Sequence, residues 1–295
     1  MNADHLQRLL LEEANVRCVV AHVDDVYREV VSRGVYPEAI GRALGEALAV
    51  VALCSSGIKL EGRVSLQLRA SSGLKLLMAD CTDAGGMRAL ARFDPEASLG
   101  TREFGQMASG GVLTMTVEPS TNRGRMWQGI VPFEGKDMAE AIAGYFEQSE
   151  QLPTRVMTSV SETGAAGVLI QRLPGEAPDD DGWNRVCKLL ETIGPEELLE
   201  TDAETLLNRL FHAERRRLFP ARALSFHCPC SRDRVTRVLR GLGREELDSI
   251  VESQGEVEVS CEFCNEQYRF DRLDVARLLA SDLPESSDDD SATVH

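Results

Sequence analysis

Four of the eight cysteines in this 295-residue chain stand in two close pairs near its C-terminal end. One residue separates Cys228 from Cys230, two residues separate Cys261 from Cys264, and thirty residues lie between the pairs. Two short-range pairs of thiolates that meet across an intervening segment are a typical ligand set for tetrahedral zinc. The sequence therefore predicts one Zn²⁺ per chain, held by these four cysteines.

The predicted zinc site is compatible with a structural or a redox role. Residues 226–280 can form only a small core, and zinc contributes roughly 10–16 kcal/mol to the folding of small zinc peptides, so a purely structural clip is one interpretation. The other is a redox switch, because metal-bound thiolates are already deprotonated and their oxidation to disulfides removes the ligands. Three disulfide pairings are open, and sequence proximity favours Cys228 with Cys230 and Cys261 with Cys264. His227 could replace one thiolate as a ligand.

Charge and hydropathy limit the class of protein. The chain carries 32 basic and 48 acidic residues, a net charge of −16, which would repel a phosphate backbone. No apolar run is long enough for a membrane span, and the N-terminus lacks a basic region followed by an apolar stretch, so we expect a cytoplasmic protein. In a reducing compartment, clustered thiols favour metal or redox roles. The other cysteines are expected to be buried small hydrophobic residues: Cys18, Cys54, Cys81 and Cys187.

Residues 1–173 alternate strand-like and helix-like stretches, which predicts an α+β domain with a mostly antiparallel sheet and helices against it. The predicted strands are 16–23, 64–70, 113–117, 156–160 and 167–173. The predicted helices are 6–11, 37–55 and 137–151, the second beginning at Pro37.

A composition break follows at residues 173–182 (LPGEAPDDDG), which predicts a domain boundary. Thr201 and Glu204 suggest a capping box at the start of one of the short helices that follow. Helices this short are marginal alone, so their apolar faces must dock elsewhere. These predicted helices are 183–193, 195–199 and 202–214. The predicted parts after the first domain are a metastable helical linker (174–225), a small zinc-binding α+β module (226–280) and an acidic disordered tail (281–295).

Three segments carry recognisable motifs. Residues 145–155 (YFEQSEQLPTR) match Y-F-x-x-S-E-Q-L-P-T-R, and residues 226–232 (FHCPCSR) match F-x-C-x-C-S-R. Residues 261–270 (CEFCNEQYRF) match C-x-x-C-x-x-x-Y-x-F. With all three in order, the chain resembles the redox-regulated chaperones of the heat shock protein 33 family over nearly its whole length.

The resemblance implies an ATP-independent holdase of bacterial stress response, not an enzyme, that is inactive while reduced and zinc-bound. In such proteins peroxide or hypochlorite converts the four cysteines to two disulfides, Cys228 with Cys230 and Cys261 with Cys264, and zinc leaves. The helical linker then unfolds, and surface for unfolding client proteins becomes available. Active members are typically homodimers. No nucleotide is needed, and the sequence contains no G-x-x-x-x-G-K-[ST] loop.

Two other functions are open. A zinc-stabilised nucleic-acid module would use the arginines after the first cysteine pair, although residues 226–280 hold eight Arg against eleven acids. A thiol–disulfide oxidoreductase would use Cys261 and Cys264, but their surroundings predict strands rather than the helix N-terminus that such a pair usually opens. A separate basic cluster, Arg215–Arg217, is interpreted as the solvated end of a helix.

Overall fold

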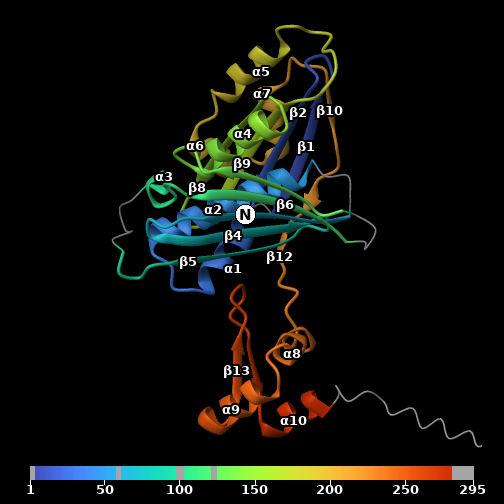
Figure 1. The fold of residues 1–295 in the computed structure, drawn as a ribbon. Coiled ribbons are helices and arrows are strands. Elements are labelled where there is room, and N and C mark those ends of the chain that lie inside the picture. Colours follow the sequence, from blue (N-terminus) through green and yellow to red (C-terminus); the bar gives the residue numbers. More distant parts are fainter. Residues whose placement is uncertain (1–3, 58–60, 98–102, 121–124, 281–295) are drawn as a thin grey trace, which may run out of the picture. The chain divides into compact units, whose positions relative to one another are not determined.

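The chain divides into two units, Met1–Cys228 and Pro229–His295, which are described separately. The computed structural model describes residues 4–57, 61–97, 103–120 and 125–280. The predicted disordered tail, 281–295, lies outside the described residues. The fold is α+β with largely antiparallel sheets, as predicted (Figure 1).

The first sheet of the first unit has the strand order β10-β1-β2-β9-β8, with β11 also pairing with β1. All its pairs are antiparallel. Its strands are β1 (His5–Leu11), β2 (Val16–His22), β8 (Thr154–Val160), β9 (Ala165–Arg172), β10 (Arg216–Leu218) and β11 (Arg222–Ala223). The segment just before the first cysteine pair is therefore fastened to the N-terminal strand.

The second sheet has the order β12-β5-β4-β3-β6-β7, in which β12 runs parallel to β5 and the other pairs are antiparallel. Its strands are β3 (Gly62–Arg69), β4 (Leu74–Thr82), β5 (Gly86–Phe93), β6 (Val112–Pro119), β7 (Trp127–Pro132) and β12 (Ser225–Phe226). Because β12 ends two residues before Cys228, this sheet positions the start of the cysteine segment.

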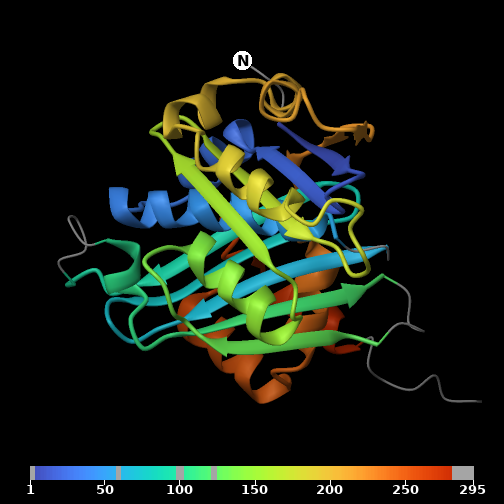
Figure 2. The same ribbon diagram turned by 90° about the horizontal axis from the view of Figure 1, so that it is seen from above.

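Helix α2 (Glu38–Ser55) lies between the two sheets (Figure 2). Fourteen of its eighteen residues are buried, and many are alanine or glycine, which let strands approach the helix from both sides. The surrounding helices are α1 (Asp24–Ser32), α3 (Phe104–Met107) and α4 (Met138–Ser149). The main core of the unit forms around α2.

The first sheet has a second apolar face, covered by three short helices. Because side chains alternate along a strand, Val19 and Leu169 join the main core while Val20 and Ile170 join a second one. The second core is closed by α5 (Gly182–Leu190), α6 (Pro195–Glu200) and α7 (Ala203–Leu210), which Figure 1 shows in yellow beside β1, β2 and β9. Helices this short were expected to pack against another element, and they pack against the second face of the first sheet.

Two sequence predictions in this unit are wrong. Residues 6–11 form β1 rather than a helix, because pairing with β2, β10 and β11 decides the conformation over the helix-like spacing of the leucines. The cap of α7 is Asp202 rather than Thr201: the Asp202 carboxylate accepts a hydrogen bond from the Thr205 N–H at 3.1 Å. The helix also ends at Leu210, and β10 follows.

The second unit is a small α+β fold built on one hairpin. Its elements are α8 (Arg232–Arg240), α9 (Arg244–Gln254), β13 (Val257–Ser260), β14 (Gln267–Phe270) and α10 (Arg272–Ala280). Its buried core includes Leu247, Val257 and Phe270 and has eight members among the described residues. A core this small gives limited stability by itself.

Among the described residues of both units, no helix combines the length and apolar character needed to cross a membrane.

Candidate metal centre

The first cysteine pair lies in the short segment between β12 and α8. Ser231 begins α8 as its N-cap, accepting a hydrogen bond from the Arg234 N–H at 3.2 Å. The Arg234 guanidinium in turn donates to the Pro229 carbonyl at 3.2 Å. These local bonds fix the bend that carries Cys228 and Cys230.

The second cysteine pair lies in the turn of the β13–β14 hairpin. The Cys261 N–H donates to the Glu266 carbonyl at 2.9 Å, and the Asn265 N–H donates to the Cys261 carbonyl at 2.7 Å. Asn265 has φ of 55°, a left-handed conformation that asparagine tolerates better than most residues. The turn therefore holds Cys261 and Cys264 on one tight loop, and the predicted strand context of this pair is confirmed.

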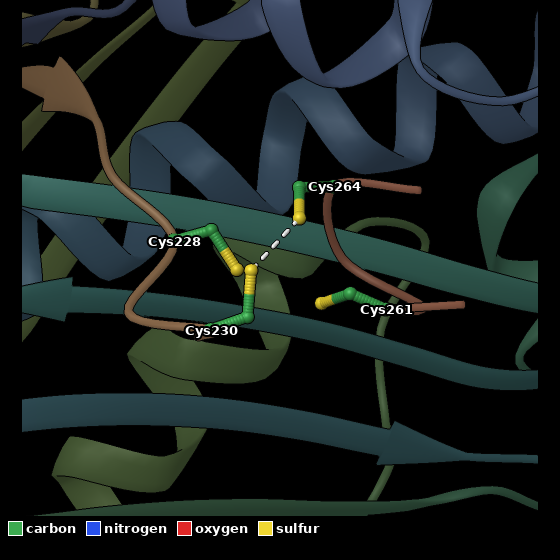
Figure 3. Close-up of side chains that lie close together, drawn as sticks. All are labelled: Cys228, Cys230, Cys261 and Cys264. Carbon is green, nitrogen blue, oxygen red and sulfur yellow. Dashed lines mark hydrogen bonds between the residues drawn. The ribbon is translucent and has the colours of Figure 1, made fainter. Parts of the chain in front are cut away.

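All four cysteines come together. Their Sγ atoms lie within 4.8 Å of one another, and Cys230 Sγ is 3.2 Å from Cys264 Sγ (Figure 3). Zinc–sulfur bonds of about 2.3 Å in a tetrahedron place sulfurs about 3.8 Å apart, so this group has the dimensions of a tetrathiolate site. Cys264 is buried and the other three are half-buried. The four-thiol donor set thus fits a soft divalent metal.

The group contains no other ligand type. Among the described parts of the chain, the cluster able to hold a metal consists of the four cysteines and does not include His227. The turn between two strands is also unlike the helix N-terminus at which a catalytic C-x-x-C pair gains its reactive thiolate. The geometry therefore favours metal binding over disulfide exchange.

Two further side chains donate to the cysteine sulfurs. The Tyr268 hydroxyl, from β14, donates to Cys230 Sγ at 3.2 Å, and this bond raises the pKa of the tyrosine. The Arg88 guanidinium, from β5, lies 3.9 Å from Cys228 Sγ and pairs with Asp80 at 2.7 Å. Donors of this kind offset the negative charge of metal-bound thiolates and orient them.

These two partners were not assigned a role from the sequence. Tyr268 belongs to the third motif, and its fixed spacing from Cys264 is the sequence signal that points to it. Arg88 is 140 residues away from Cys228 in the chain, and no local pattern links the two. Long-range pairing of β12 with β5 is what brings them together.

Arg232 fastens the elements around the site. Its guanidinium stacks on the Phe270 ring at 4.2 Å, donates to the Arg269 carbonyl at 2.9 Å and pairs with Asp274 at 2.7 Å. Arg232 therefore joins α8, which follows the first cysteine pair, to β14 and α10, which follow the second.

The cysteines outside the cluster are less available for reaction. Cys18, Cys54 and Cys81 are buried and Cys187 is half-buried. Burial raises the pKa of all four thiols, that of Cys54 to about 12. A raised thiol pKa leaves little thiolate at neutral pH, so these cysteines are poor nucleophiles.

The prediction that Arg215–Arg217 is the end of a helix is wrong. Arg216 and Arg217 lie on β10, and Arg215 pairs with Glu12 at 2.9 Å. Arg217 also pairs with Glu12, and Arg216 donates to the carbonyls of Phe211 and His212 at 3.1 Å. The basic cluster fastens this segment to the turn after β1 and to the end of α7.

Comparisons with known proteins identify relatives of the whole chain. The sequence model of the family described as "Hsp33 protein" matches residues 4–271. The "33 kDa chaperonin" of Methylobacillus flagellatus is 38% identical over 284 residues, covering 95% of this chain and 96% of that protein. That of Neisseria meningitidis serogroup A is 39% identical over 283 residues, covering 95% and 93%.

The fold also has a solved counterpart. The crystal structure of the 33 kDa chaperonin from Thermotoga maritima, an Hsp33 homologue, matches with a TM-score of 0.82. It is 20% identical in sequence, and the match covers 95% of this chain and 99% of that one.

Proposed function

The chain belongs to the Hsp33 protein family, and from this premise we propose that it is a redox-regulated, ATP-independent holdase. In the reduced state Cys228, Cys230, Cys261 and Cys264 hold one Zn²⁺, and the protein is inactive. Oxidation forms disulfides between Cys228 and Cys230 and between Cys261 and Cys264, and releases the metal. Formation of each disulfide transfers two electrons from a pair of thiols to the oxidant, so two molecules of peroxide are reduced to water for the two disulfides formed per zinc released.

The observation that carries the proposal is the second apolar face of the first sheet. Phe211 and Leu206 are fully buried against strand residues such as Ile170. The three helices that cover this face have nine, six and eight residues. Helices this short depend on tertiary packing, so the cover can be lost without unfolding the main core.

Loss of the cover would expose apolar surface on both partners, the strands and the helices. Unfolding clients present the same kind of surface, and burial of apolar area drives association. We place client binding on this face and on the unfolded residues 174–225, which act as a metastable linker. The net charge of −16 helps to keep such complexes in solution.

The connection between the cysteines and the cover runs through the chain between α7 and Cys228. This stretch holds only the short strands β10, β11 and β12, of three, two and two residues. Two of them pair with β1, whose Leu9 and Leu11 belong to the second core. When zinc release unfolds residues 226–280, these strands lose one fixed end, and the edge of the second core loosens.

Further parts of the proposal follow from the family. Residues 1–173 would carry client binding and dimerisation, and the active form would be a homodimer in the cytoplasm. The client is an unfolded or partly unfolded protein, and neither nucleotide nor nucleic acid takes part.

The test follows zinc release, with a chromogenic chelator, and light scattering of a thermally unfolding client in one sample. We expect about one zinc per chain to leave on oxidation, and aggregation to be suppressed only afterwards. Cys54→Ser, which removes a thiol of the main core outside both the cluster and the covering helices, should respond like the native chain. If zinc stays bound, or leaves without client protection, the cluster is a structural clip and the proposal fails.

A further inference from the structure

We propose that a hollow in the first unit binds a small amphipathic carboxylate, with Arg17 as the group that receives its charge. The hollow has a volume of about 350 Å³ and is bounded by the ends of α2 and α4 and by strands of both sheets. The switch described above does not use it, and this inference does not depend on that switch.

Arg17, on β2, is an uncompensated cation. Its Nε is buried and has no hydrogen-bond partner, and within the described ranges the guanidinium pairs with no carboxylate. Burial lowers its pKa, and the nearby charge of Arg8 lowers it further. The Cys54 thiol beside it has a pKa of about 12 and is neutral at pH 7. Arg17 as a whole is half-buried, and a partly desolvated charge without a partner is costly, so an anion would relieve that cost.

The fold leaves room for this guanidinium. Gly57, just after α2, has no side chain, and a Cβ there would lie 2.5 Å from Arg17 Nη1. Any larger residue at position 57 would displace the guanidinium from the hollow. The absence of a side chain at Gly57 therefore leaves space for the Arg17 guanidinium beside the hollow.

The remaining walls are mostly apolar and aromatic. Met115, Val117 and Trp127 come from β6 and β7, and Phe146 and Leu152 from the end of α4 and the loop after it. About a dozen water molecules would fill 350 Å³ of liquid, which is room for a short alkyl chain. An apolar pocket with one cation is the pattern expected for an amphipathic anion.

The rim is held by the first sequence motif, YFEQSEQLPTR. Gln151, two residues after the end of α4, has φ of 55°, and the Leu152 N–H donates to the Phe146 carbonyl at 3.0 Å. This turn directs Leu152 into the wall of the hollow. Glu150 also lines the hollow, but it is exposed and accepts from the Tyr145 hydroxyl at 3.5 Å. The motif thus builds the pocket and leaves Arg17 without a carboxylate partner.

The test uses the tryptophan emission of the full chain, reduced and zinc-loaded. The chain has two tryptophans, and a Trp183→Phe background leaves Trp127 in the hollow as the reporter. Octanoate is titrated as the probe, with octan-1-ol, octylammonium and acetate as comparisons. We expect saturable binding of octanoate, binding of the alcohol and the amine at least about tenfold weaker, and no response to acetate.

Two variants test whether Arg17 is the group that receives the negative charge of octanoate. Arg17→Met should lose the preference for octanoate over octan-1-ol, while Arg28→Gln, at a half-buried position on α1 outside the hollow, should keep it. The proposal would be overturned by equal affinity of the native chain for octanoate and octan-1-ol. It would also be overturned if Arg17→Met bound octanoate as tightly as the native chain, or if octanoate caused no saturable change in tryptophan emission. If Arg17→Met does not fold, the comparison of the three octyl probes on the native chain still decides it. Client aggregation is measured separately, so failure of this site is distinguishable from failure of the chaperone proposal.

Discussion

The hydroxyl of Tyr268 donates a hydrogen bond to Cys230 Sγ at 3.2 Å, which ties the strand after the second cysteine pair to a thiol of the first. Cys230 Sγ also lies 3.2 Å from Cys264 Sγ. Cys230 is therefore the cysteine at which the two halves of the proposed metal site meet. A change in its surroundings should alter zinc release without removing a ligand.

Tyr268→Phe removes the hydroxyl and keeps the ring. We expect zinc transfer to a chelator to become about tenfold more favourable, because a thiolate that loses a hydrogen-bond donor is a less stable ligand. Tyr36→Phe is the matched control, since it removes a half-buried tyrosine hydroxyl of the first unit. Equal chelator titrations for Tyr268→Phe and the native chain would show that the bond does not support the metal.

The covering layer can be weakened without touching a cysteine. Phe211→Ala should cost about 3–5 kcal/mol of packing in the second core and give partial client protection by the reduced, zinc-loaded chain. Leu66→Ala removes buried volume from the main core and should lower thermal stability without producing that activity. Client light scattering under reducing conditions measures the client protection given by each variant, and thermal unfolding measures its stability. An inactive, folded Phe211→Ala protein would argue against the covering layer as the regulated element.

The cysteine cluster was predictable from the sequence because spacing alone brings each pair into one turn. The N-terminal strand was not, since Leu6, Leu9 and Leu10 have helical spacing and the partner strand β10 begins at residue 216. The same limit applies to Arg215–Arg217, whose partners lie on the turn after β1 and at the end of α7. Local pattern predicts elements, but strand pairing across the whole chain decides which of them form.

Cysteine reactivity should separate the cluster from the other thiols. After zinc is removed with a chelator, Cys228, Cys230, Cys261 and Cys264 should be alkylated first, and Cys187 more slowly. Cys18, Cys54 and Cys81 should react only on global unfolding, because they are buried and burial raises their thiol pKa. Peptide mass mapping over time measures the order. Early labelling of Cys18 in the folded chain would contradict it.

Glu46 should make stability depend on pH. Burial raises its pKa to about 7, while its ordinary value is 4.5, and it accepts the Met138 N–H at 3.2 Å. The folded chain therefore binds this proton more tightly than the unfolded chain does. The resulting stabilisation is complete below pH 4.5 and is lost as the pH rises through 7.

Glu46→Gln cannot ionise and can still accept that hydrogen bond. We expect it to raise the free energy of unfolding by roughly 1–3 kcal/mol at pH 8 and to have little effect near pH 5. Denaturant unfolding at both pH values measures this. Glu38→Gln, at an exposed position on the same helix, is the control and should change neither value. A gain by Glu46→Gln that is the same at both pH values would contradict the assignment.

The most direct test of the account is hydrogen–deuterium exchange of the same sample before and after oxidation, with client light scattering recorded in parallel. We expect the amides of α5–α7, residues 182–210, to be protected in the reduced, zinc-loaded chain and to exchange rapidly once zinc has left. Strands β3–β6 should remain protected throughout. Client protection by an oxidised chain whose α5–α7 amides are still protected would contradict the central claim.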